Sequence, residues 1–117
     1  MRKLTKAVSV AAAVAMTATC FSTTAFADDT FKIGGIGPIT GGAAVYGQAV
    51  MNASQMAADD INAEGGINGY QIEFNFQDDE HDAEKSVNAY NTLKDWGMQM
   101  LLGTVTSTPC TAVEGEA

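Results

Sequence analysis

The stretch "FKIGGIGPITGGAAVYGQ" (residues 31–48) decides how this sequence folds, because an apolar run passes through a glycine-rich loop into a helix-forming segment. The apolar content of 31–37 predicts a strand. From about Val45 to Ala63 the period becomes helical, and one face is expected to carry Tyr46, Val50, Ala53, Ala57 and Ile61. Gly65 and Gly66 then predict the end of this helix, because glycine reaches the left-handed conformation that helix ends often need.

The same alternation continues to the end of the chain. Residues 67–77 predict a turn at Asn68-Gly69 and then a strand, since apolar and polar residues alternate from Ile72 to Gln77. Residues 78–97 predict a second helix that Gly97 closes, with an apolar face made of Ala83, Val87, Tyr90, Leu93 and Trp96.

The last apolar run, residues 98–103, predicts a buried strand. A third helix is expected after it, with Thr108 as its N-cap and Pro109 at its first helical position. The resulting order β-α-β-α-β-α predicts an α/β fold of the Rossmann-like kind, a parallel sheet with helices on both faces. Ligands bind such sheets beyond the carboxyl ends of the strands, where the loops 37–46 and 103–109 lie.

Residues 1–27 have the three-part pattern of a secretory signal peptide. Three basic residues lie within the first six positions, an apolar run follows over 7–18, and "AFA" (25–27) supplies the small residues that precede a cleavage site. The apolar run is shorter than the about 20 residues that span a bilayer. We expect cleavage after Ala27 and export to the periplasm or the cell surface.

A lipid anchor at Cys20 is the alternative way to end this signal. Thr17 and Thr19, however, stand where a lipoprotein signal prefers a leucine-like residue and a small residue. After cleavage at Ala27 the chain keeps one cysteine, Cys110, so no internal disulfide can form. Residues 28–117 carry three lysines and 14 acidic residues, a net charge of −11 that argues against nucleic acid or anionic lipid as a partner.

The glycine-rich loop does not complete a nucleotide-binding motif. Gly35-Ile36-Gly37 begins the dinucleotide pattern, but Thr40 occupies its final glycine position. Gly37 and Gly42 have the glycine spacing of a P-loop, but alanines follow where lysine and a hydroxyl residue would hold phosphate and magnesium. A flexible turn between strand and helix is a second interpretation of these glycines.

The acidic run "DDEHDAE" (78–84) does not complete a metal site. Alanine stands where a calcium loop needs its turn-forming glycine and again where it needs its last carboxylate. His81, the single histidine, has no second zinc ligand at a suitable spacing. We therefore expect these carboxylates to stabilise a helix N-terminus. No catalytic constellation is found around Ser107 or Cys110, so neither an enzyme nor a cofactor is expected.

The segment "TVTSTP" (104–109) predicts the most specific chemistry in the chain. Thr106, Ser107 and Thr108 place three hydroxyls where a helix starts, beside backbone N–H groups that have no partner within the helix. Hydroxyls, free N–H groups and the helix dipole together suit a small anion such as a carboxylate. Simple N-capping by one of the hydroxyls is the alternative, and the two roles do not exclude each other.

Three segments together resemble the type I periplasmic-binding receptors, and within them the branched-chain amino acid substrate-binding proteins of ABC transporters. These segments are "FKIGGIGPITGGAAVYGQ" (31–48), "AADDINAEGGINGYQIEFNFQDDEHDAEKSV" (57–87) and "LLGTVTSTPC" (101–110). The resemblance covers residues 28–117 and implies two α/β lobes that close on a ligand about a hinge. This chain would supply the N-terminal portion of the first lobe.

The resemblance also implies a set of ligand-binding residues. Ser107 would receive the carboxylate of an amino acid, with Val105 and Thr106 contributing backbone or packing contacts, and Tyr46 would lie near the ligand's side chain. Permease subunits of an ABC transporter would be the partners. The family also includes receptors for amides and urea, so the ligand stays open. The sequence is also compatible with a sensory ligand-binding domain, a flavodoxin-like or nucleotide-binding domain, or a non-functional truncated product.

Overall fold

The computed structural model describes residues 29–117, so the predicted signal peptide and Cys20 lie outside the described residues. Strands and helices alternate as the sequence predicts. They are β1 (Thr30–Gly37), α1 (Ala44–Ala63), β2 (Gln71–Asp78), α2 (Ala83–Trp96), β3 (Met100–Thr104) and α3 (Ser107–Glu114). The predicted helix ends are confirmed, because Gly65, Gly66 and Gly97 all have positive φ angles.

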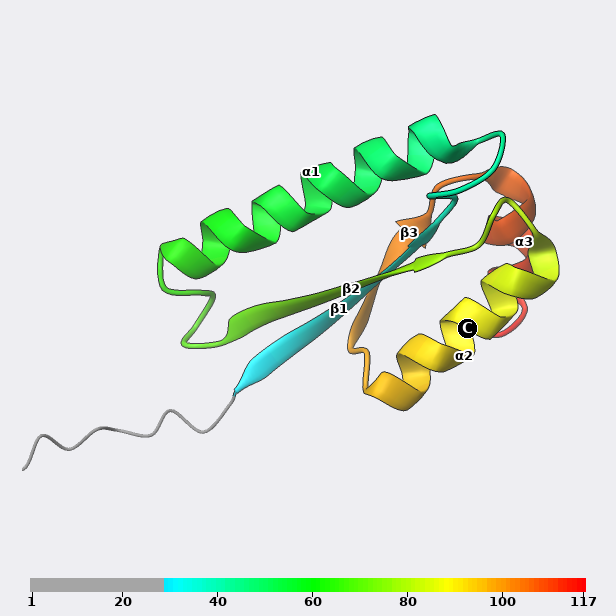
Figure 1. Cartoon of the computed structure of the whole chain (residues 1–117). Helices are drawn as coiled ribbons and strands as arrows, with labels where there is room; N and C mark the ends of the chain where they lie inside the picture. Colours follow the sequence, from blue (N-terminus) through cyan, green and yellow to red (C-terminus); the bar gives the residue numbers. More distant parts are fainter. Residues whose placement is uncertain (1–28) are drawn as a thin grey trace, which may run out of the picture.

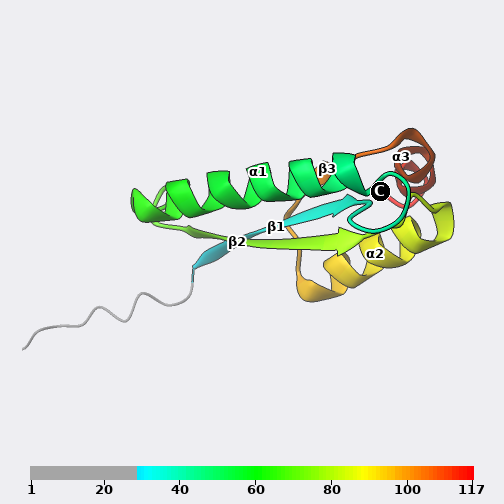
Figure 2. The same ribbon diagram turned by 45° about the horizontal axis from the view of Figure 1, so that its top comes forward.

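The three strands form one parallel sheet in the order β2-β1-β3. Helix α1 covers one face of this sheet and α2 the other, while α3 packs beside α2 and against β3 (Figures 1 and 2). The α/β class with helices on both faces is therefore confirmed. Since every strand leads into a helix, the carboxyl ends of the strands and the starts of all three helices gather at one end of the molecule.

The core lies on the α2 face of the sheet. Ile36 of β1, Ala89 and Leu93 of α2 and Val113 of α3 are its buried members, and Tyr90, Trp96, Met98 and Leu101 pack against them. The predicted apolar face of α2 is confirmed at Tyr90, Leu93 and Trp96. Asp82 caps the helix by accepting from the backbone N–H of Lys85, as expected for this acidic segment.

The buried face of α1 is displaced by one residue from the predicted one. Gly47 and Ala58 are its buried residues, whereas Ala53 and Ala57 of the predicted face are exposed. These two alanines line a hollow of about 310 Å³ that α1 shares with the sheet, including Leu102. Helix α1 thus lies over β1 and β2, and its β3-facing side is uncovered among residues 29–117.

The prediction that the last strand is buried is wrong. Leu101 packs against the core, but Met100 and Leu102, which alternate with it, are 47% and 42% exposed. Within residues 29–117, β3 pairs with β1 alone and no helix covers its second face. A hollow of about 360 Å³ extends the same apolar surface past Phe31, Ile67 and Tyr70.

The outer edge of β2 is occupied at one position by a side chain of α1. Gln71 directs its backbone N–H toward the β1 side, where it donates to the Asp29 carbonyl, so the backbone of Ile72 points the opposite way. There Asn62 accepts from the Ile72 N–H and donates to the Ile72 carbonyl, each at 2.7 Å. The amide of Asn62 therefore takes the place that the backbone of a further strand would occupy.

Candidate ligand-binding site

Three loops meet at the carboxyl end of the sheet, and each follows a different strand. We call residues 38–43 after β1 the glycine loop, residues 78–82, which begin with the last residue of β2, the acidic turn, and residues 104–108, which begin with the last residue of β3, the hydroxyl loop. Because β1 is the central strand, its loop lies between the other two. The two loops that the sequence singled out as specialised are thus held at one end of the molecule.

The hydroxyl loop lines a hollow of about 270 Å³. Its walls are Thr104, Val105, Thr106 and Ser107 together with Cys110 and Thr111 of α3. Gly103 lies directly before this loop and forms a bulge in β3. The pairing of β1 with β3 passes from Leu102 to Thr104 without it, and its φ angle of 49° is left-handed. A bulge of this kind turns the strand end and re-aims the residues that follow. Three of the four predicted site residues therefore border one hollow.

The start of α3 lies two residues before the predicted one. Thr106, not Thr108, is the N-cap residue, so Pro109 occupies the third helical position. Proline is tolerated there because the first N–H groups of a helix have no partner within the helix. Within the described chain no side chain caps α3. Simple N-capping thus does not account for the hydroxyls, and the first N–H groups of α3 keep their capacity to donate.

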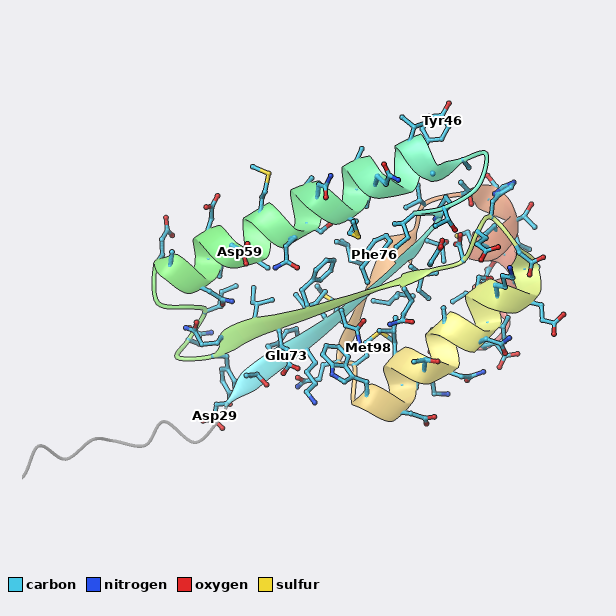
Figure 3. The ribbon with its side chains drawn as sticks, viewed as in Figure 1. Asp29, Tyr46, Asp59, Glu73, Phe76 and Met98 are labelled. Atoms are coloured by element: carbon cyan, nitrogen blue, oxygen red, sulfur yellow. The ribbon has the colours of Figure 1, made fainter. Side chains whose placement is uncertain are left out.

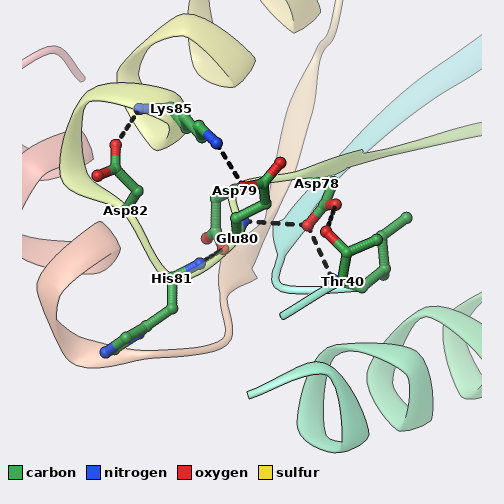
Figure 4. Close-up of polar contacts among 8 residues, drawn as sticks. Thr40, Asp78, Asp79, Glu80, His81, Asp82 and Lys85 are labelled. Carbon is green, nitrogen blue, oxygen red and sulfur yellow. Dashed lines mark hydrogen bonds and ion pairs between the residues drawn. The ribbon is translucent and has the colours of Figure 1, made fainter. Parts of the chain in front are cut away.

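The acidic turn contacts both neighbouring loops through side chains. Asp78 accepts from the Ile39 N–H at 2.9 Å and from the Thr40 hydroxyl at 2.5 Å, both in the glycine loop (Figure 4). On the other side, Nδ1 of His81 lies 2.8 Å from the hydroxyl oxygen of Thr106 in the hydroxyl loop. Residues 78 and 81 thus join the glycine loop and the hydroxyl loop.

The pKa values of two neighbouring carboxyl groups in the acidic turn, those of Asp78 and Asp79, are shifted in opposite directions. Burial acts to raise the pKa of Asp78, but hydrogen bonds from the Thr40 hydroxyl and from the N–H groups of Ile39 and Glu80 together hold it below its usual value. Burial raises the pKa of Asp79, and the negative charge of Asp78 adds to this effect. Asp79 is fully buried, and its Oδ2 finds no partner among the residues that the structure describes.

Five of the six glycines of 34–47 fall into two structural groups, and the sixth, Gly47, contacts the backbone of Pro38. A β-carbon on Gly34, Gly35 or Gly37 would overlap the side chains of Met98, Phe76 or Val105, so these glycines permit close packing on the sheet. Gly41 and Gly42, in contrast, have no other group within 4 Å of a built β-carbon, and they leave open space in the glycine loop.

Tyr46 lies in the first turn of α1, at the same end of the molecule as the three loops. Its side chain is 66% exposed and projects away from the sheet (Figure 3). It does not border the hollow of the hydroxyl loop. The structure thus brings Val105, Thr106 and Ser107 together and leaves Tyr46 apart from them.

Sequence reasoning missed the connecting role of Asp78 and His81. Nothing in their spacing distinguishes a carboxylate that accepts from another loop from one that only sits at a helix N-terminus. The sequence carries no signal for this role; the structure marks the turn by the left-handed φ angles of Glu80 and His81, 48° and 61°, which are uncommon for non-glycine residues.

The family model described as periplasmic binding protein matches residues 30–116, nearly all of the described chain. The chain belongs to the periplasmic binding protein family. Members of this family act outside the cytoplasmic membrane and bind ligands without transforming them. Among residues 29–117 of this family member, no helix combines the length and apolar character that a membrane span requires.

Individual relatives fit this family assignment. The Leu/Ile/Val-binding protein BraC3 of Rhizobium johnstonii is 38% identical over 95 residues, which are 79% of this chain and 26% of BraC3. The branched-chain amino acid transporter substrate-binding protein LivJ of Streptococcus pneumoniae, solved with isoleucine, superposes with a TM-score of 0.71 at 32% identity, covering 75% of this chain and 26% of LivJ.

A fatty acid ABC transporter substrate-binding protein of Thermomonospora curvata also gives a TM-score of 0.71, at 28% identity, covering 76% of this chain and 23% of that protein. The fold therefore does not by itself select the ligand. The chain spans about a quarter of the length of the curated relatives it matches.

Proposed function

We propose that residues 28–117 form the N-terminal portion of the first lobe of an extracytoplasmic substrate-binding protein that captures a branched-chain amino acid for an ABC transporter. The hollow at the start of α3 carries this proposal, because Thr106 and Ser107 present hydroxyls there beside N–H groups that no side chain caps. Such an arrangement suits the α-carboxylate of an amino acid. Relatives named for leucine, isoleucine and valine support the choice of ligand.

Each proposed site residue has a separate task. Ser107 donates its hydroxyl and backbone N–H to the carboxylate, and Val105 and Thr106 shape the floor of the hollow. Tyr46, an exposed aromatic at the same end of the molecule, is outside the hollow and would meet the ligand's apolar side chain where that side chain extends beyond it. The groups that hold the α-ammonium belong to a second lobe, so residues 28–117 alone bind leucine much more weakly than a two-lobed protein does.

The proposed mechanism is closure of two lobes around the ligand. A ligand that contacts both lobes favours the closed state by its differential affinity for that state. Permease subunits then distinguish the closed, loaded form from the open one, and the ligand is released unchanged. A signal peptide over residues 1–27 delivers the protein across the cytoplasmic membrane.

The test uses the complete reading frame that contains this chain, which we call the full-length protein. Calorimetric titration with leucine, isoleucine and valine is expected to show saturable binding, whereas acetamide and urea give none. Binding of an amide or urea instead would reassign the ligand within the same family. Absence of any response to amino acids would refute the amino acid assignment.

Two neighbouring variants test the carboxylate role directly. Ser107→Ala removes a hydrogen bond to a charged group and should weaken leucine binding about tenfold to hundredfold. Thr108→Val removes the adjacent hydroxyl, which does not border the hollow, and should leave the affinity within about twofold. Full affinity in Ser107→Ala would remove this residue from the site.

A further inference from the structure

The acidic turn contacts both specialised loops through side chains, and none of its residues borders the hollow. We infer that Asp78 and His81 are positioning residues, which fix the glycine loop and the hydroxyl loop relative to each other and thereby set the shape of the ligand site. This inference rests on the proposed function for its effect on affinity, while its structural content can be tested without ligand.

Asp78 holds the glycine loop. Its two carboxylate oxygens accept from different groups, Oδ1 from the Ile39 N–H and Oδ2 from the Thr40 hydroxyl. The Oδ1 atom also accepts from the N–H of Glu80 at 3.0 Å. A single side chain therefore fixes the start of the glycine loop and the first bend of the acidic turn together.

His81 holds the hydroxyl loop. The contact between its Nδ1 and Thr106 Oγ1 joins residues 25 positions apart, and the structure shows it at the N-cap residue of α3. Thr106 precedes Ser107 directly, so a change in the position of Thr106 moves the proposed carboxylate donors. The Thr106 hydroxyl is used in this contact and not as a helix cap.

The acidic turn itself is held in a fixed shape. Left-handed φ angles at Glu80 and His81 are costly for non-glycine residues and persist only when surrounding contacts impose them. Those contacts are present: the fully buried Asp79 accepts from the His81 N–H at 2.8 Å, and its own N–H donates to the Gly37 carbonyl at 3.2 Å. These hydrogen bonds fix the backbone from which the side chain of His81 projects (Figure 4).

The first experiment measures loop protection in the unliganded full-length protein by hydrogen–deuterium exchange. His81→Ala should speed exchange of amides in the hydroxyl loop about threefold to tenfold, since one hydrogen bond is lost. Thr40→Val should do the same in the glycine loop, and Glu80→Gln, in the same turn but bonded to Lys85, should change neither. Unchanged exchange in His81→Ala overturns the inference.

The second experiment measures leucine affinity and separates positioning from general stability. His81→Ala should weaken binding about threefold to tenfold, whereas His81→Asn should restore it, because the asparagine amide can reach Thr106 and tolerates a left-handed backbone. A residue needed only for its left-handed backbone would be rescued by glycine as well, so His81→Gly, which has no side chain to reach Thr106, should bind as weakly as His81→Ala if His81 is a positioning residue. Failure of the asparagine variant to recover affinity therefore counts against positioning.

Variants of Thr106, the other partner of the contact, test the inference even if His81→Ala does not fold. Thr106→Val removes the same hydroxyl from the hydroxyl loop, and Thr106→Ser keeps it. If His81→Ala does not fold, faster loop exchange in Thr106→Val and normal exchange in Thr106→Ser carry the same conclusion. If the unmodified protein binds no amino acid, the proposed function fails, and the exchange experiment alone still decides the positioning role.

Discussion

The carbonyl oxygen of Pro38 occupies the space where a β-carbon of residue 47 would stand, and Gly47 is the residue that permits this contact. Gly47 lies in the first turn of α1 and is buried, while Pro38 begins the glycine loop. The helix start is therefore seated directly on the backbone of the loop that follows β1.

Gly47→Ala should destabilise the protein by about 1–3 kcal/mol, because the obstructing group is backbone and cannot rotate away. Gly42→Ala is the matched control: its β-carbon meets open space, so the free energy of unfolding should change by less than about 0.5 kcal/mol. Urea unfolding of the two variants measures the difference. Equal stabilities would mean that the helix start can shift at no cost.

Asn62→Ala should lower the free energy of unfolding by about 1–2 kcal/mol, because both hydrogen bonds to the Ile72 backbone are lost at the outer edge of β2. Asn52→Ala, an exposed asparagine of the same helix, should be neutral or slightly stabilising. Thermal unfolding followed by circular dichroism compares them. A loss of similar size in Asn52→Ala could not come from helix propensity, which favours alanine, and would show that the effect at Asn62 is not specific to its contacts with Ile72.

Asp79→Asn should gain stability relative to the unmodified protein as pH rises. The pKa of Asp79 is raised in the folded state, so its favourable contribution is complete below the unfolded pKa, about 3.9, and disappears as pH rises through the folded pKa. Asparagine does not titrate, so the stability difference should increase with pH above about 4 and then level off.

Asp78→Asn is the control for this measurement, because it should show the opposite sign. Hydrogen bonds hold the pKa of Asp78 below its usual value, so its contribution is present above about pH 3.9 and is lost as pH falls through the folded pKa. Urea unfolding from about pH 3 to about pH 7 tests both variants. Parallel pH curves for the two would contradict the assigned shifts.

Leucine should slow the modification of Cys110 by a thiol reagent. Cys110 is exposed and borders the hollow beside Ser107, so a ligand held there screens it from the reagent. Mass spectrometry of the peptide containing Cys110 gives the rate with and without leucine. Equal rates at saturating leucine would place the ligand outside this hollow, and alanine, valine and urea at the same concentration show whether the protection is selective.

Local patterns in the sequence were sufficient for the order of elements. The change from period two at Ile72–Gln77 to helical spacing at Ala83–Trp96 depends on neighbouring residues alone, as does the turn at Asn68-Gly69, which the structure confirms with φ angles of 51° and 83°. The parallel sheet then follows from the alternation of strands and helices, since right-handed crossovers leave few different arrangements.

What local patterns could not predict depends on partners distant in the sequence. Ala53 and Ala57 have the spacing of a buried face, but burial requires a covering element, and within the described residues none lies over β3. By residue type Thr106 and Thr108 are equally suitable caps, and the contact of Thr106 with His81, 25 positions earlier in the chain, is not visible in the local sequence. Consecutive hydroxyls before a helix are a local signal and predicted an anion site at Thr106, Ser107 and Thr108, of which Thr106 and Ser107 border the hollow, whereas Val105 was implied only by the family resemblance.

The two outer edges of the sheet, at β2 and at β3, differ in whether their backbone groups are already occupied. At β2 the amide of Asn62 already holds the outward backbone groups of Ile72, whereas β3 keeps an unpaired edge within the described residues, flanked by the apolar side chains of Met100 and Leu102. At Ile72 the outer edge of β2 is therefore closed to a further strand, whereas no such contact is seen at the outer edge of β3 among the described residues. An unpaired strand edge with apolar side chains beside it is also a surface on which two copies of a protein can associate edge to edge.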